Sequence, residues 1–92
     1  MGDPVFHLKV FFEGHVQGVG FRFTTFQLAK GYEVTGYVKN LNDGRVQLEL
    51  EGDRDECVGF NKALNEEMAG FIRDKTQVKD TRQPEFKDFT IR

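Results

Sequence analysis

The stretch GHVQGVGFRF, residues 14–23, joins a segment typical of a β-strand to one typical of an α-helix. The helix is expected to begin near Phe21, yet no Ser, Thr, Asp or Asn precedes it to cap its free backbone N–H groups. Arg22 lies in the first turn, where the helix dipole disfavours a positive charge. These two departures from the usual pattern coincide, which indicates that a ligand satisfies the exposed donors.

The glycines of this stretch favour an anion as that ligand. Gly14, Gly18 and Gly20 carry no Cβ and so permit close approach of backbone or ligand. A tight loop that enters a helix N-terminus directs several N–H groups into one small space, which suits a phosphate. Arg22 would then pair with two phosphate oxygens. An ordinary turn with Arg22 in solvent also fits these residues, and the spacing matches neither a P-loop nor a dinucleotide-binding fingerprint.

Apolar periodicity on both sides of the loop predicts the other elements. Asp43-Gly44 indicates a hairpin turn, and Asp53 with Glu56 forms a capping-box pattern at the start of a second helix. The expected strands are 5–13, 33–40, 45–51 and 86–91, with a polar edge strand over 71–81, and the expected helices are 21–30 and 54–69.

This order predicts the fold class and brings two candidate site residues together. Strand, helix, strand, strand, helix, strand, strand is typical of a two-layer α+β sandwich, with two helices on one face of a mixed, mostly antiparallel sheet. The right-handed crossover through the first helix makes the first two strands parallel, so both end at the same edge. Ligands favour such edges, so Arg22 and Asn40 are expected to converge. Residues 1–92 are expected to form a single domain.

Two longer motifs resemble the acylphosphatase family. These are GHVQGVGFR (14–22) and GYVKNLNDGRVQLELEG (36–52), and the closing FKDFTIR (86–92) is similar to the family's last strand. The resemblance implies a ferredoxin-like sandwich that hydrolyses carboxyl-phosphate anhydrides without a metal or cofactor. It places the phosphate-binding arginine at Arg22 and the water-positioning asparagine at Asn40. The phosphate-binding loop it implies consists of His15, Val16, Gln17, Gly18, Val19, Gly20 and Phe21.

The loop departs from the family pattern at His15, which stands where the family usually has Arg, and at Gly20, which occupies a variable position. Neither change touches Arg22 or Asn40, so both bear on rate and affinity more than on the type of reaction.

The implied chemistry is compatible with so sparse a site. An acyl phosphate releases a carboxylate, whose conjugate acid has a pKa of about 4, so the leaving group needs no general acid. Phosphoryl transfer mainly requires positioning and stabilisation of charge on the equatorial oxygens, which backbone N–H groups and Arg22 supply. The neutral amide of Asn40 can hold the attacking water, whereas a carboxylate would be repelled by the phosphate.

Composition narrows the set of partners. The formal net charge of −2 gives no general attraction to nucleic acid or to an anionic membrane, and no apolar run or signal peptide indicates membrane insertion or export. The lone Cys57 is expected in the core of a cytoplasmic protein, and His7 and His15 lack metal-ligand spacing. The expected state is a monomer that binds an acyl phosphate, with inorganic phosphate or sulfate as a product-like ligand.

Two alternatives to an active enzyme stay open. One is a family member that has lost activity and binds phosphate or a protein partner. The other is an RNA-binding module with the same order of elements, in which Phe11 and Tyr37 would stack bases on the exposed sheet face. Gln47, Glu49 and Glu51 would make that face acidic, and the aromatic pattern of such modules is absent, which disfavours the second alternative.

Overall fold

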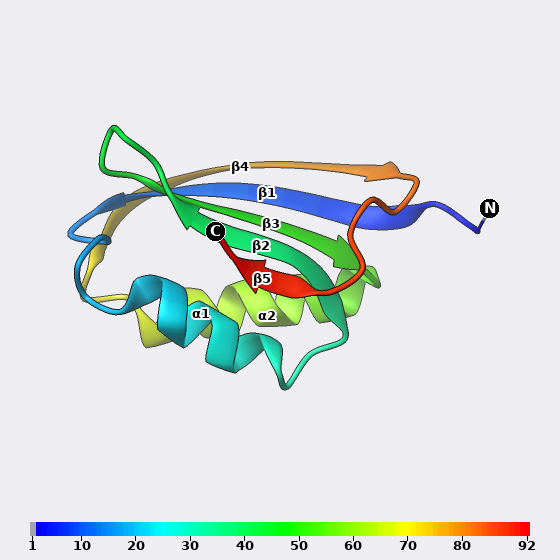
Figure 1. Ribbon diagram of the computed structural model, residues 1–92, viewed down its shortest axis with the longest axis horizontal. Coiled ribbons are helices and arrows are strands. Elements are labelled where there is room, and N and C mark those ends of the chain that lie inside the picture. Colours follow the sequence, from blue (N-terminus) through cyan, green and yellow to red (C-terminus); the bar gives the residue numbers. More distant parts are fainter. Residues whose placement is uncertain (1) are drawn as a thin grey trace.

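The computed structural model describes residues 2–92 and shows a single sheet with both helices packed on the same face (Figure 1). This arrangement confirms the predicted α+β sandwich. The elements, in chain order, are β1 (Val5–Gly14), α1 (Phe21–Ala29), β2 (Val34–Asn40), β3 (Val46–Gly52), α2 (Arg54–Glu67), β4 (Ile72–Arg82) and β5 (Phe89–Ile91).

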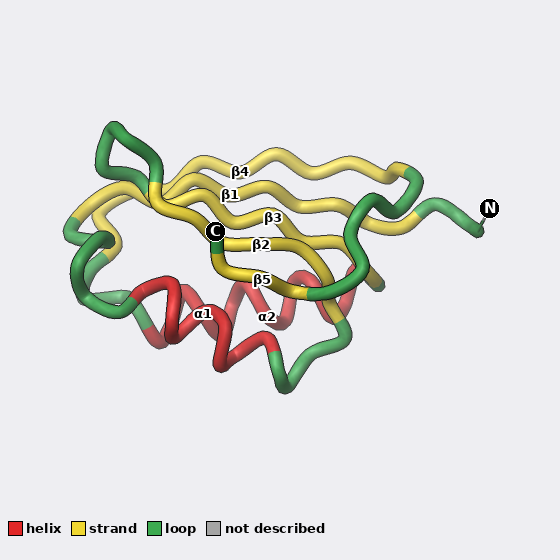
Figure 2. Tube along the Cα trace, viewed as in Figure 1, coloured by secondary structure: helices red, strands yellow, loops and turns green. Residues whose placement is uncertain are grey.

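The topology brings the loop after β1 and the turn after β2 to the same end of the sheet. The strand order is β4-β1-β3-β2-β5, and every neighbouring pair is antiparallel except β2 with β5. Because β1 and β2 both pair antiparallel with β3, they run in the same direction, as the crossover predicts. Figure 2 shows the loop at 15–20 and the turn at 41–45 together at this end.

The core lies between the sheet and the helices. Alternate residues of the three central strands supply one side of it, and the apolar stripes of the helices supply the other. The rings of Phe12 and Phe21 pack with centroids 5.1 Å apart, which joins the end of β1 to the first residue of α1. The core includes Leu8, Val10, Phe12, Val16, Phe21, Val38, Val46, Leu48, Leu50, Cys57, Phe60 and Leu64.

Two expectations about local structure are wrong. Asp53 is the N-cap of α2 but makes no side-chain capping bond, and Glu56 Oε1 instead accepts a hydrogen bond from the backbone N–H of Glu33 at 2.7 Å. In a capping box the Glu56 carboxylate would accept from the backbone N–H of Asp53, but here it accepts from Glu33, outside the helix. The last strand is also shorter than the expected 86–91, since pairing with β2 begins only at Phe89.

The polar segment before β5 connects the two edges of the sheet. β4 and β5 lie on opposite edges of the sheet, so the crossing segment (residues 83–88) must pass from one edge to the other. Figure 1 shows it beyond the arrowhead of β4, descending to the start of β5.

Within residues 2–92, neither helix has the length and apolar character needed to cross a membrane.

Candidate functional site

The N-terminus of α1 has no side-chain cap. Gly20 occupies the N-cap position with φ of 77°, no side chain in residues 2–92 bonds the free N–H groups, and the first turn of this helix contains no acidic residue. The positive end of the helix dipole therefore faces outward beside the cation of Arg22, as the sequence predicts. Such a helix end favours an anion.

The glycines of the loop serve two different purposes. A Cβ on Gly18 or Gly20 would meet no atom within 4 Å, but both residues have left-handed φ angles, 80° and 77°. They therefore allow the loop to curl over the helix start. A Cβ on Gly14 would instead lie 2.5 Å from the backbone oxygen of Phe71, so this glycine is needed for close approach of two chain segments.

The loop is fastened to the rest of the fold by contacts that the sequence did not predict. His15 donates its backbone N–H to the oxygen of Phe71 at 2.9 Å. The side-chain amide of Gln17 donates to the backbone oxygens of Leu41 at 2.8 Å and Arg45 at 2.9 Å. Leu41 directly follows Asn40, so Gln17 ties the loop to the turn that carries the candidate water-positioning residue.

The loop residues divide between the core and the surface. Val16 is fully buried, and Phe21 is buried against Phe12, so these two can offer a ligand only their backbone. Gln17 and Val19 are half-buried. The exposed positions, where an anion can approach, are His15, Gly18 and Gly20.

Arg22 reaches toward the end of β2 through the residue that follows β5. Its Nη1 donates to the backbone oxygen of Arg92 at 3.2 Å, and the N–H of Arg92 donates to the oxygen of Val38 at 2.8 Å. Asn40 is the last residue of β2 and, by strand alternation, shares the helix-covered face with Val34 and Val38. Both candidate catalytic residues therefore lie at the same end of the sandwich.

The chemistry available at this end is that of neutral and cationic donors. Backbone N–H groups, the Arg22 guanidinium and the Asn40 amide can bind an anion and orient a water molecule. In residues 2–92 no group of three or more His, Cys, Asp or Glu side chains is arranged to hold a metal ion.

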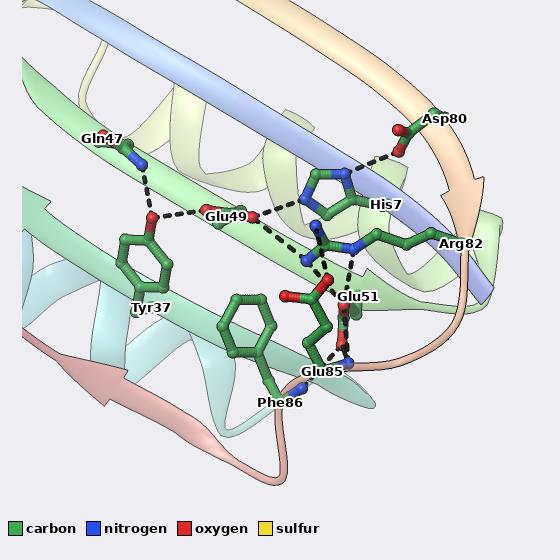
Figure 3. A network of polar contacts seen from close by, with 9 residues as sticks. All are labelled: His7, Tyr37, Gln47, Glu49, Glu51, Asp80, Arg82, Glu85 and Phe86. Atoms are coloured by element: carbon green, nitrogen blue, oxygen red, sulfur yellow. Dashed lines mark hydrogen bonds and ion pairs between the residues drawn. The ribbon is translucent and has the colours of Figure 1, made fainter. Parts of the chain in front are cut away.

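A polar network covers the sheet face opposite the helices (Figure 3). Glu49 is its centre: Tyr37 donates its hydroxyl to Oε2 at 2.5 Å, and His7 Nε2 lies 2.8 Å from Oε1. The other ring nitrogen of His7 lies 2.8 Å from Asp80. Burial, together with Glu49, raises the pKa of Tyr37 to about 12. Burial also acts to raise the pKa of Glu49, but hydrogen bonds with Tyr37 and His7 outweigh it, and the net shift is downward.

Fold and site together define a small ferredoxin-like domain with a candidate anion site at the start of its first helix. Comparison with known proteins places it more narrowly. The family model described as acylphosphatase matches residues 8–91, and the chain belongs to the acylphosphatase family.

Similar proteins cover nearly the whole chain. An acylphosphatase of Thermotoga maritima is 38% identical over 85 residues, which span 92% of this chain and 94% of the relative. The crystal structure of acylphosphatase from Bacillus subtilis superposes with a TM-score of 0.83 at 26% identity, covering 94% of this chain and 97% of the other. An acylphosphatase structure from Coxiella burnetii gives a TM-score of 0.80 at 27% identity, with coverage of 98% and 94%.

Proposed function

We propose that this chain hydrolyses acyl phosphates to a carboxylate and inorganic phosphate, and that the loop at 15–21 with Arg22 holds the phosphoryl group. The observation that carries the proposal is the uncapped N-terminus of α1, which has left-handed Gly20 at its N-cap and a cation in its first turn. A bound phosphate satisfies the free N–H groups and gives Arg22 a partner. Membership of the acylphosphatase family supports the same substrate class.

In the proposed reaction the protein supplies position and charge stabilisation. Backbone N–H groups of the loop and the Arg22 guanidinium bind the equatorial oxygens, where charge accumulates in the transition state. A water molecule held by Asn40 attacks phosphorus as the bond to the acyl oxygen breaks. The carboxylate leaves with the electron pair of that bond, and a phosphate oxygen takes the proton of the attacking water.

Cys57 has no part in this reaction. It is fully buried on α2, and burial, with neighbouring acids such as Asp53 contributing, raises the pKa of its thiol to about 11. A thiol of this kind stays protonated and unreactive near neutral pH.

A free, buried cysteine also supports the further proposal of a cytoplasmic protein, and a small chain with a polar surface supports a monomer.

The covered sheet face argues against the RNA-binding alternative. Tyr37 is only 6% exposed: the guanidinium carbon of Arg92 lies over its ring, 4.1 Å from the centroid, and the ring of Phe86 packs against it at a steep angle with centroids 5.6 Å apart. A base therefore has no open face of Tyr37 on which to stack.

Release of inorganic phosphate from acetyl phosphate and benzoyl phosphate, with and without EDTA, tests the proposed function. We expect hydrolysis that is unchanged by the chelator, since the proposed donors are all protein groups. Activity that disappears in EDTA and returns with a divalent ion would overturn the metal-free mechanism. Phosphate binding without any hydrolysis would indicate the alternative of a binding protein that has lost activity.

A further inference from the structure

Glu51 holds the crossing segment through its backbone. This carboxylate of β3 is 1% exposed, and its Oε1 accepts hydrogen bonds from the N–H groups of Glu85 at 2.8 Å and Phe86 at 3.0 Å. Its Oε2 accepts from Nε and Nη2 of Arg82 at 3.0 and 2.8 Å. Glu51 therefore binds both the end of β4 and the middle of the segment that leads to β5 (Figure 3).

Glu49 provides a natural comparison on the same strand. It lies two residues away on the same face, it is 6% exposed, and it also pairs with Arg82, at 3.2 Å. Its other partners are the side chains of His7 and Tyr37. Its hydrogen bonds within residues 2–92 include none to a backbone N–H of the crossing segment. The two glutamates thus share burial and charge but differ in what they hold.

The crossing segment leads through β5 to the residue that contacts Arg22. At its end, the oxygen of Asp88 accepts from the N–H of Gly36 at 2.9 Å, and β5 then pairs with β2 over Phe89–Ile91. Arg92 follows, and its oxygen accepts the hydrogen bond from Arg22. Because β5 has three residues and lies at an edge, its placement depends strongly on how the chain before it is held.

We propose that Glu51 is a positioning residue for the phosphate site, which acts by fixing the crossing segment and, through β5 and Arg92, the guanidinium of Arg22. This inference rests on the proposed role of Arg22 in binding phosphate. A carboxylate suits the task because it is acceptor-only, and all four donor groups around it point inward. Glutamine has a single acceptor oxygen, and its NH₂ group would face N–H groups of the crossing segment or of Arg82.

Glu51→Gln and the matched Glu49→Gln separate this role from general stability. Amide hydrogen exchange reports the placement of β5 at the N–H groups of Arg92 and Gly36, and the amide of Leu48 in the central strand reports global unfolding. We expect exchange at Arg92 and Gly36 to rise by at least about tenfold in Glu51→Gln, relative to Leu48, and to change little in Glu49→Gln.

Phosphate affinity, compared between Glu51→Gln and Glu49→Gln, tests the effect on the site itself. Titration of inorganic phosphate, followed by NMR at a temperature where both variants are folded, should show binding weakened roughly 2- to 30-fold in Glu51→Gln and much less in Glu49→Gln. The KM for acetyl phosphate should follow the same order. If Glu51→Gln does not fold, Glu51→Asp keeps the charge with a shorter reach and should show smaller changes in the same direction.

Equal exchange at Arg92 and equal phosphate affinity in the two glutamine variants would overturn the proposal. This result is distinguishable from failure of the proposed function, in which the wild type itself would neither bind phosphate nor hydrolyse acetyl phosphate. In that case faster exchange at Arg92 in Glu51→Gln alone would support the positioning of β5, and its absence would contradict it.

Discussion

The guanidinium of Arg22 donates a hydrogen bond to the backbone oxygen of Arg92 across 3.2 Å, although 70 residues separate them in sequence. The contact uses Nη1. Within residues 2–92, the Arg22 side chain makes no other hydrogen bond. One nitrogen thus contacts the backbone that follows β5, and no hydrogen bond in this part of the chain occupies the remaining donors of the group. An arginine held in this way is prepared to pair with two phosphate oxygens.

Replacing Arg22 with lysine tests whether that geometry matters. We expect Arg22→Lys to lose nearly as much activity as Arg22→Ala, since a compact ammonium lacks the planar fork of N–H groups that pairs with two phosphate oxygens. Loss of one transition-state donor of this type typically costs on the order of 100- to 1,000-fold in kcat. Measurement of kcat and KM for benzoyl phosphate in both variants decides the matter. A lysine variant within a few-fold of wild type would show that charge alone suffices.

Asn40→Ala separates the role of the water from that of the anion. If Asn40 orients the attacking water, its loss should abolish turnover and leave competitive inhibition by inorganic phosphate largely intact. Steady-state kinetics over a series of phosphate concentrations measure both effects. If inhibition weakens as much as turnover slows, then Asn40 binds the anion and the assigned role is wrong.

Tyr37 predicts a pH dependence of stability at the alkaline end. Its pKa in the folded protein, about 12, lies above the unfolded value of 10.0, so folding favours the protonated phenol. The resulting stabilisation, on the order of 2 kcal/mol, is complete below pH 10 and is lost as the pH rises toward 12. Urea unfolding at pH 8 to 11.5 should show wild type more stable than Tyr37→Phe by about 1 kcal/mol at pH 8, with the difference falling above pH 10 and changing sign before pH 11.5. Parallel pH profiles for the two proteins would contradict this assignment.

Local sequence patterns predicted the elements that are covered on one side. Apolar periodicity predicted β1 and α2, and Cys57 of α2 is fully buried in the core, as expected. These patterns report which side of an element is buried, because each is set by the geometry of that element alone.

The opposite sheet face was harder to predict because residues distant in sequence cover it. Glu49 and Glu51 were expected to make an acidic exposed face, yet both are buried beneath contacts from β1, β4 and the crossing segment. Their alternation with leucines is the same whether solvent or another segment lies above them. Only the positions of β4 and β5 on opposite edges explain why the chain must pass over this region.

At the candidate site, too, local features could be predicted from the sequence and contacts between distant residues could not. The missing cap and the first-turn cation could be recognised in the sequence, and both are present at the start of α1. The contacts of Gln17 with Leu41 and Arg45 could not, because a glutamine in a loop carries no signal of a partner 24 or 28 residues away.

Thermal unfolding in a phosphate titration tests most directly whether the N-terminus of α1 is an anion site. A ligand that binds only the folded state stabilises it by roughly 2.7 kcal/mol at a hundred times Kd, and each kcal/mol raises the Tm of a domain this small by about 4–8 °C. At constant ionic strength, millimolar phosphate should raise the Tm of wild type by several degrees, whereas Arg22→Ala should keep only the general effect of salt on the protein surface. If wild type and Arg22→Ala respond alike across the titration, the stretch at 14–23 is an ordinary turn and the proposed phosphate site does not exist.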